Sequence, residues 1–405
     1  MSAPLRPVPD TPVADTPALG APAPAGAHVA RLLLSDFRSY RTLDLPVAGG
    51  LVALTGENGA GKTNILEALS LFTPGRGLRR AELPDMVRVG ASAGFAVSIE
   101  LATPQGDVQM GTGLERSEPD GAFSRRCRID RAPAGSPAAF AEHLRVVWLT
   151  PAFDGLFAGA AGDRRRFLDR LVLAVDSEHG GRVNALDRAL RSRNRLLAED
   201  RLDHAWLDAV EREAAETAVA VSAARRETVE RLAALIAATR DDASPFPWAA
   251  IALDGPLEAD LARRPALDVE DAYRDLLRES RLRDRAAGRT LVGPQAADLV
   301  VRHGPKDVAA ASASTGEQKA LLIGLVIAHA RLVAAMTGLA PLVLLDEIAA
   351  HLDPRRRVAL YETLAGLGSQ VWMTGADASA FAGLPRGGET FEVTPGAVRP
   401  MTAAR

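Results

Sequence analysis

Residues 51–69, LVALTGENGAGKTNILEAL, constrain the fold of this chain more than any other stretch. Five strand-forming residues lead into a segment with three glycines, and a helical pattern runs from about Gly61 to Leu71. Glycine permits backbone conformations that other residues avoid, so such a loop turns tightly and keeps its N–H groups on its inner side. The stretch predicts a buried strand, a glycine loop and a helix, the opening unit of an α/β fold.

The same loop fits the phosphate-binding pattern G-x-x-x-x-G-K-[ST]. Its N–H groups would surround the β-phosphate of ATP, Lys62 would reach the β- and γ-phosphate oxygens, and the Thr63 hydroxyl would ligate Mg²⁺. A chance match is disfavoured because the chain has only three lysines, Lys62, Lys306 and Lys319. The residues expected to bind the phosphates are Gly56, Glu57, Asn58, Gly59, Ala60, Gly61, Lys62, Thr63 and Asn64.

A second pattern is PLVLLDEIAAHLD, residues 341–353. Four apolar residues predict a buried strand that ends in Asp346 and Glu347. Beside a phosphate-binding loop, Asp346 suits Mg²⁺, directly or through water, and Glu347 suits the polarisation of an attacking water. The alternative, an acidic turn before a helix, is common but is disfavoured by the loop.

A third pattern is SASTGEQKALL, residues 312–322. Small hydroxyl residues, Glu317 and a long apolar run predict the start of a helix. Free N–H groups and the helix dipole make such a start a place for an anion. Taken alone, an ordinary capping box is the favoured interpretation.

Composition excludes several classes of protein. The net charge of −3 excludes a globally basic nucleic-acid binder, so any DNA contact needs a local patch. A single cysteine, Cys127, excludes an internal disulfide and fits a reducing cytosol. The longest apolar run, Leu321–Met336, contains His329 and Arg331 and is too short to span a bilayer, so no membrane partner is expected.

We expect a disordered Pro/Ala-rich leader at 1–27 that is not a signal peptide. The α/β core would comprise residues 28–162 and 288–405. A mainly helical insertion would occupy 163–287, with one helix over Asp203–Arg240 that is about 55 Å long.

Further short segments are expected to be strands. A group within the first part of the core predicts an antiparallel region: Phe95–Leu101, Val108–Leu114, Arg128–Asp130 and Val146–Leu149. The segments TLVG, DLVVRH and QVWMTG predict strands after the insertion, and a further helix is expected near Glu270–Ala287.

The order of these patterns resembles that of the ATP-binding-cassette ATPases. More closely, residues 29–395 resemble the RecF family, the bacterial recombination-repair branch of that superfamily. The segments that carry this resemblance are LLLSDFRSYRTLDL, FTPGRGLRRAEL, VVWLTPAFDGLFAGAAGDRRRFLDRLV, SRNRLL, TLVGP and STGEQKALLIGLVIAHA.

The resemblance implies an ABC-type P-loop ATPase head, in which a mixed sheet with helices accompanies an antiparallel β region. A lever-like, mainly helical second lobe would be inserted in it. In such ATPases two heads join on ATP, so Ser314, Gly316 and Glu317 would face the γ-phosphate that the partner subunit binds. Asp353 resembles a dimer-contact aspartate, and Glu347 and Lys62 would be the catalytic residues.

The implied function is that of a cytoplasmic ATPase with ATP and Mg²⁺ as cofactors. ATP would assemble a homodimer that clamps double-stranded DNA at gaps or junctions, and slow hydrolysis would release it. By resemblance, the protein would help to load the RecA recombinase together with RecR and RecO.

Some residues depart from the related patterns. Gly375 stands where transport-type cassettes carry a switch histidine, and Thr315 stands where they favour glycine. Gln295 and Ala296 replace a His-Arg pair of the RecF family, which leaves the contacts of that pair in doubt.

Two alternatives stay open. A transporter's ATPase subunit is disfavoured by the missing histidine and by the long insertion between Lys62 and Ser314. A non-turnover SMC-like DNA clamp is disfavoured because Glu347 is intact and the insertion is too short for coiled-coil arms.

Clustered arginines are the candidates for DNA phosphate contacts. For each cluster alone, internal ion pairs or a solvated face is the favoured interpretation. Tyr40 is a candidate to stack on adenine, although a packed tyrosine is slightly favoured. The clustered arginines are Arg76, Arg79, Arg80, Arg125, Arg126, Arg128, Arg164, Arg165, Arg166, Arg191, Arg193 and Arg195.

Overall fold

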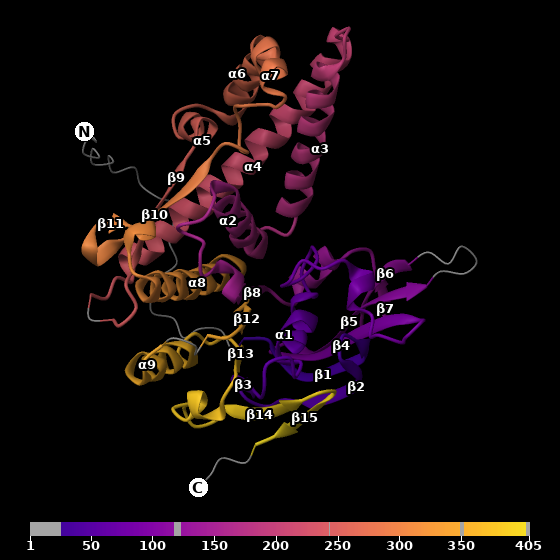
Figure 1. Cartoon of the computed structure of the whole chain (residues 1–405), viewed down its shortest axis with the longest axis vertical. Coiled ribbons are helices and arrows are strands. Elements are labelled where there is room, and N and C mark those ends of the chain that lie inside the picture. Colours follow the sequence, from indigo (N-terminus) through magenta and orange to yellow (C-terminus); the bar gives the residue numbers. More distant parts are fainter. Residues whose placement is uncertain (1–25, 117–122, 243, 349–351, 402–405) are drawn as a thin grey trace.

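The computed structural model describes residues 26–116, 123–242, 244–348 and 352–401. Figure 1 shows a helical lobe at the top, an antiparallel sheet on the right and a mixed sheet below helix α8 (Thr315–Thr337). The expected leader lies outside the described residues except for Gly26 and Ala27. Ala27 is buried, and a Cβ added at Gly26 would lie 2.7 Å from the carbonyl oxygen of Gly368. These two residues are therefore packed against the head.

The mixed sheet carries the glycine loop and the acidic strand end. Its order is β15-β14-β3-β13-β12-β8, and all neighbours are parallel except β14 and β15. The strands are β3 (Leu51–Thr55), β8 (Val146–Leu149), β12 (Leu342–Leu345), β13 (Val371–Gly375), β14 (Glu389–Thr394) and β15 (Ala397–Pro400). Because β13 lies between β3 and β12, the loop after β3 and Asp346 after β12 emerge at the same edge of the sheet.

The expected antiparallel region forms the second sheet, with the order β2-β1-β4-β5-β6-β7. Helix α1 (Lys62–Ser70) lies between the two sheets, and its Ile65 and Leu66 belong to a core that both sheets share. One assignment is wrong: Val146–Leu149 is β8, which pairs in parallel with β12 in the mixed sheet. The strands of the second sheet are β1 (His28–Phe37), β2 (Tyr40–Pro46), β4 (Gly94–Thr103), β5 (Gly106–Arg116), β6 (Phe123–Ile129) and β7 (Ala132–Ala134).

The helical lobe is built on one long helix. Helix α4 (His204–Ala238) matches the predicted helix to within two residues at each end, and Asp203 caps it by accepting a hydrogen bond from the Trp206 amide. The single helix expected near 270–287 is two helices that are separated at Ser280. The other helices are α2 (Ala161–Val175), α3 (His179–Ala198), α5 (Pro256–Leu261), α6 (Ala266–Glu279) and α7 (Arg281–Ala287).

A small third sheet joins the insertion to the returning chain. Strand β9 (Ala249–Asp254) lies within the insertion and pairs antiparallel with β10 (Asp298–His303), which is the predicted DLVVRH strand. Strand β11 (Val308–Ala309) completes this sheet. The predicted strand TLVG is wrong, because Thr290–Gly293 is irregular, with Gly293 at φ +138°.

A buried ion-pair network holds the core of the helical lobe. The fully buried Arg193 donates to Glu211 at 2.9 Å, to Asp284 at 2.7 Å and to the Thr290 hydroxyl at 2.7 Å. A buried guanidinium stabilises a fold only when its donors find partners. Arg193 is therefore a structural residue and is not available to DNA.

Helix α8 crosses the interior of the head. Its 23 residues are long and apolar enough to cross a membrane, but the apolar window is 67% buried, as in the core helix of a folded domain. Helix α9 (Pro354–Ala365) follows β12. The short 3-10 turns are η1 (Leu83–Met86), η2 (Pro137–Glu142), η3 (Pro151–Phe153), η4 (Gly304–Lys306), η5 (Ala310–Ser312) and η6 (Ala378–Phe381).

Candidate nucleotide-binding site

The loop between β3 and α1 requires glycine at its bends. Gly56, Gly59 and Gly61 have φ values of +140°, +87° and +114°. A Cβ at Gly56 would lie 2.2 Å from the carbonyl oxygen of Val393, and one at Gly61 would lie 2.7 Å from the Tyr40 hydroxyl. The close packing of neighbouring chain therefore fixes the path of the loop.

Lys62 lies folded into this loop. Its side chain is almost fully buried, and Nζ donates to the carbonyl oxygens of Gly56 and Glu57, the latter at 2.8 Å. Burial lowers the pKa of Lys62, and the carboxylates of Glu347 and Asp346 act in the opposite direction. The ammonium therefore lies in the centre of the loop, near both acidic residues.

The loop helix and the acidic strand end meet at Thr63 and Asp346. The Thr63 hydroxyl donates to Asp346 Oδ1 at 2.9 Å, although 283 positions separate the two residues. The Thr374 hydroxyl, on β13, donates to the same oxygen at 2.8 Å. Because Thr63 gives its proton to Asp346, its oxygen lone pairs remain available to a cation.

Glu347 follows Asp346 in an unusual backbone conformation, with φ +51°. Its N–H donates to the Thr374 hydroxyl at 2.8 Å, and the residue is exposed. A non-glycine residue at positive φ persists only where its surroundings fix it, and such residues cluster at functional sites. The chain thus turns sharply at the point where the predicted catalytic carboxylate stands.

The third sequence pattern forms the start of α8 as predicted. Ser314 caps the helix, accepting from the Glu317 amide at 3.4 Å, and Glu317 accepts from the Ser314 amide at 3.1 Å. Lys306 also donates to Glu317, and these bonds lower the pKa of that carboxyl to about 2. Ser314 and Gly316 are exposed, and a Cβ added at Gly316 would meet no atom within 4 Å. The helix start is open on this side.

Comparisons with known proteins bear on the family and the fold of this chain. The model of the RecF/RecN/SMC N terminal domain matches residues 28–384. The chain is 52% identical over 381 residues to the DNA replication and repair protein RecF of Mesorhizobium japonicum, which covers 94% of this chain and 100% of that protein. The chain belongs to the RecF family. RecF of Rhizobium meliloti is also 52% identical, over 93% of this chain and 99% of that protein.

Solved structures show the same fold. A RecF–ATP structure from the RecFOR pathway has a TM-score of 0.78 at 19% identity and covers 94% of this chain and 99% of its own. The Smc head domain of Pyrococcus furiosus has a TM-score of 0.52 at 16% identity, over 93% and 96% of the two chains. The predicted ABC/SMC-type ATPase head is confirmed, and membership of the RecF family argues against the transporter alternative.

The residues at the strand edge fit Mg²⁺. This ion takes few protein ligands, prefers hard oxygen donors and is usually shared with substrate phosphates. Thr63 and Asp346 supply one hydroxyl and one carboxylate side by side. Across the described ranges, no group of three or more His, Cys, Asp or Glu could hold a metal. Two protein ligands suit Mg²⁺, which usually keeps several waters.

Asp353, the predicted dimer contact, is exposed at the start of α9. Its carboxylate accepts from the Arg356 amide at 3.0 Å, which lowers its pKa. The residues 349–351 that link it to Glu347 lie outside the described residues.

Tyr40 is a packed tyrosine, the interpretation that the sequence slightly favoured, and it is not placed to stack on adenine. Tyr40 is fully buried, and its hydroxyl donates to the Gly61 carbonyl oxygen at 3.2 Å. It therefore stabilises the backbone of the phosphate-binding loop. Burial raises its pKa.

Asn64, predicted to bind phosphate, is held by neighbouring residues. Its amide donates to Ser39 at 3.0 Å and accepts from Arg79 at 2.8 Å. Beneath it, Glu67 of the same helix is fully buried and paired with Arg38. The contact between Arg38 and Glu67 is not predictable from the sequence, since nothing in the local pattern shows that the two residues meet.

Most of the clustered arginines satisfy internal acceptors. Arg125 donates to the carbonyl oxygens of Gly75 and Leu71, and Arg164 forms a two-point pair with Asp298 at 2.8 and 2.7 Å. For these, the interpretation as internal contacts is confirmed. Three exposed arginines form no ion pair with any described acidic residue: Arg80, Arg191 and Arg195.

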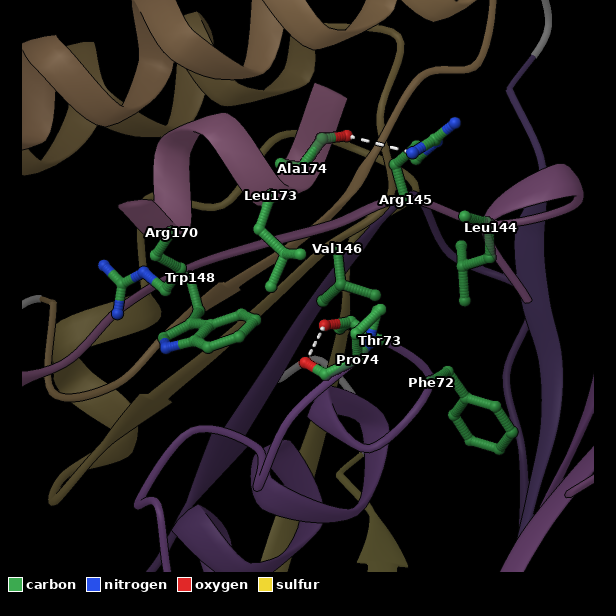
Figure 2. Close-up of a pocket in the computed structure, with 11 residues that line it drawn as sticks. Phe72, Thr73, Pro74, Leu144, Arg145, Val146, Trp148, Arg170, Leu173 and Ala174 are labelled. Atoms are coloured by element: carbon green, nitrogen blue, oxygen red, sulfur yellow. Dashed lines mark hydrogen bonds between the residues drawn. The ribbon is translucent and has the colours of Figure 1, made fainter. Parts of the chain in front are cut away.

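A small hollow of about 20 Å³ lies apart from the loop (Figure 2). Thr73, Trp148 and Arg170 are among its lining residues, and none of residues 56–63 is. The Arg170 guanidinium lies 4.8 Å from the centre of the Trp148 ring, and burial lowers its pKa to about 9. Figure 2 shows mainly apolar side chains around this space, which fits a packing defect between α2 and the turn after α1.

Proposed function

We propose that this protein is an ATPase of recombinational DNA repair that binds ATP and Mg²⁺ and dimerises on ATP. The dimer clamps double-stranded DNA, and slow hydrolysis releases it. One observation carries this proposal: the Thr63–Asp346 hydrogen bond unites the glycine loop and the acidic strand end in a single site. This contact supports the proposal, because phosphoryl transfer needs a phosphate-binding loop and an acidic metal ligand side by side.

In the proposed hydrolysis of ATP, each residue of the site has a separate role. On ATP binding, Lys62 exchanges the carbonyl oxygens of Gly56 and Glu57 for phosphate oxygens, and the loop N–H groups surround the β-phosphate. Glu347 orients a water and accepts its proton as the water oxygen bonds to the γ-phosphorus. The bond to the bridging oxygen breaks, and ADP leaves with that electron pair. Bound Mg²⁺ supplies charge neutralisation on the phosphates, next to Thr63 and Asp346.

The site is completed in trans. Ser314 and Gly316 stand exposed at the start of the 23-residue helix α8, where N–H groups and the dipole favour an anion. In the proposed dimer this turn contacts the γ-phosphate held by the partner subunit. Glu317 keeps the turn in shape through its capping bonds. Asp353 contacts the partner subunit in the proposed dimer.

DNA binding would rest on local positive charge, because the whole chain has a net charge of −3. Arg80, Arg191 and Arg195 are the best candidates, since they are exposed and unpaired among the described residues. From the family resemblance, we place the protein in the cytoplasm at gaps or junctions, where it assists RecA loading with RecR and RecO.

The test is DNA binding and dimer formation by the purified protein, with and without ATP and Mg²⁺, at one fixed salt concentration. We expect ATP-dependent dimers that bind duplex DNA, and the loss of both in Lys62→Ala and in Ser314→Ala. Ser312→Ala is the matched control, because it removes an exposed serine in the same segment that does not cap the helix. ATP binding without DNA affinity in any state would contradict the proposal.

A further inference from the structure

Thr374 connects the two acidic residues of the site. It is the fourth residue of β13 and is fully buried. Its hydroxyl lies 2.8 Å from Asp346 Oδ1 and 2.8 Å from the Glu347 amide nitrogen. Since an ionised carboxylate only accepts and an amide only donates, the hydroxyl must give its one proton to Asp346 and accept from Glu347.

These two bonds act on different parts of the reaction. The first fixes the carboxylate that stands beside Thr63, and therefore the oxygens available to Mg²⁺. The second holds the backbone of Glu347 at φ +51°, a conformation that needs support from its surroundings. One side chain thus sets the position of both the metal ligand and the proton acceptor.

The next position of the strand cannot take this role. A Cβ at Gly375 would lie 2.7 Å from the ring of Phe381, which is buried and packs against Tyr361 at a centroid distance of 6.0 Å. A side chain at position 375, where transport-type cassettes carry their histidine, would have to displace that ring. The contribution of β13 to the site therefore comes from Thr374.

We infer that Thr374 is a positioning residue that couples the Mg²⁺ ligand Asp346 to the catalytic residue Glu347. This inference rests on the proposed function. Groups that orient a metal ligand typically change metal affinity or activity by roughly 10- to 100-fold when they are removed. Loss of the Thr374 hydroxyl is expected to raise the Mg²⁺ concentration that nucleotide binding requires and to slow hydrolysis at saturating Mg²⁺.

The decisive comparison is between Thr374→Val, which keeps the shape and removes the hydroxyl, and Thr374→Ser, which keeps the hydroxyl. Equilibrium binding of a fluorescent ATP analogue is measured over a Mg²⁺ titration, and hydrolysis is measured separately. In the valine variant, the Mg²⁺ concentration at half-saturation should rise about 10-fold and kcat should fall by about 10-fold or more. The serine variant should restore both values. If the valine variant does not fold, Thr374→Ala replaces it.

Thr112→Val is the matched control. Thr112 is also a buried strand threonine whose hydroxyl accepts an N–H, from Arg125 Nε at 3.1 Å, but it lies in the antiparallel sheet. The Thr112→Val variant should be less stable than the wild type but should have the same Mg²⁺ titration. Asp346→Asn, which removes the proposed metal ligand, should shift the titration to higher Mg²⁺ concentrations.

If Asp346→Asn shifts the titration and Thr374→Val does not, the coupling is overturned while the proposed function stands. If the wild-type protein binds no ATP with Mg²⁺, the proposed function itself fails.

Discussion

Arg38 and Glu67 form a two-point ion pair beneath the phosphate-binding loop. Nε and Nη2 of Arg38 lie 2.8 and 2.7 Å from the two carboxylate oxygens of Glu67, which is fully buried in α1. Arg79 approaches the same carboxylate to 3.4 Å from a more exposed position. The helix that begins with Lys62 is thereby anchored to the turn between β1 and β2.

Removal of Arg38 should destabilise the fold. In Arg38→Met, the buried Glu67 carboxylate keeps only the weaker Arg79 interaction, so we expect a decrease of about 3 kcal/mol in the free energy of unfolding. Urea unfolding measures this decrease. Arg76→Ala, which breaks the exposed pair with Glu82, should cost less than about 1 kcal/mol. If the two variants lost the same free energy of unfolding, the buried pair would contribute no more to stability than the exposed one.

The capping carboxylate Glu317 should make stability depend on pH in acid. Its pKa is about 2 in the folded protein and 4.5 ordinarily, chiefly because Lys306 donates to it. The stabilisation is therefore fully present above pH 4.5 and is lost as the pH falls towards 2. We expect the stability difference between wild type and Glu317→Gln to shrink across that window. Thermal unfolding at stepped pH measures it, and a difference that stays constant would refute the assignment.

His329 should act in a higher pH range and in the same direction, because the folded protein again favours the deprotonated form. Burial lowers its pKa from 6.5 to about 4, and its Nε2 lies 2.9 Å from the Leu171 carbonyl oxygen. The unfolded chain takes up the proton near pH 6.5 and the folded chain only near pH 4. Stability should therefore fall by about 3 kcal/mol between those values.

His329→Gln should lack this component of the pH dependence, because glutamine does not titrate. His143→Gln, at a partly exposed position, controls for the removal of a histidine elsewhere. The comparison uses urea unfolding at stepped pH. Identical pH slopes for wild type and His329→Gln would contradict the prediction.

Glu347→Gln should separate ATP binding from turnover. A positioned general base contributes about 10²- to 10⁴-fold to a rate, so single-turnover hydrolysis should slow by that factor while ATP binding and dimer formation persist. The DNA complex should then last longer than that of wild type. Unchanged hydrolysis in this variant would contradict the role of Glu347 as the general base, and if neither this variant nor the wild type hydrolysed ATP, the non-turnover clamp would be favoured.

Exposed arginines that bind DNA phosphates should make the DNA affinity depend on salt concentration. Alanine at Arg80, Arg191 or Arg195 should weaken DNA binding and reduce the slope of log affinity against log salt by about 1 for each arginine that binds a phosphate. Arg263→Ala is the control, because Arg263 is exposed but paired with Asp260. An unchanged slope for all three variants would place the DNA elsewhere.

The sequence predicts best where local chemistry determines the structure. The loop from Gly56 to Thr63, the buried strand before Asp346 and the capping box at Ser314 each follow from residues within one short segment. The long helix α4 follows from its apolar stripe and its cap at Asp203. These elements, and the family that they resemble, are confirmed.

The sequence predicts poorly where distant segments meet. The pairing of β8 with β12, the strand β9 and the burial of Arg193 depend on interactions between residues far apart in the chain. Thr374 was missed for the same reason, because a threonine in an apolar strand shows its role only when Asp346 and Glu347 are beside it.

The pairing of β9 with β10 also determines how the protein can be divided. Residues of α2, α4, β9 and β10 share one hydrophobic core with β3, β12 and β13. The apolar side chains of the insertion and of the head are therefore buried against each other. Excision of residues 163–287 would expose that core and remove the partner of β10. The two lobes should consequently melt in one calorimetric transition, and neither should be obtainable as an independently folding fragment.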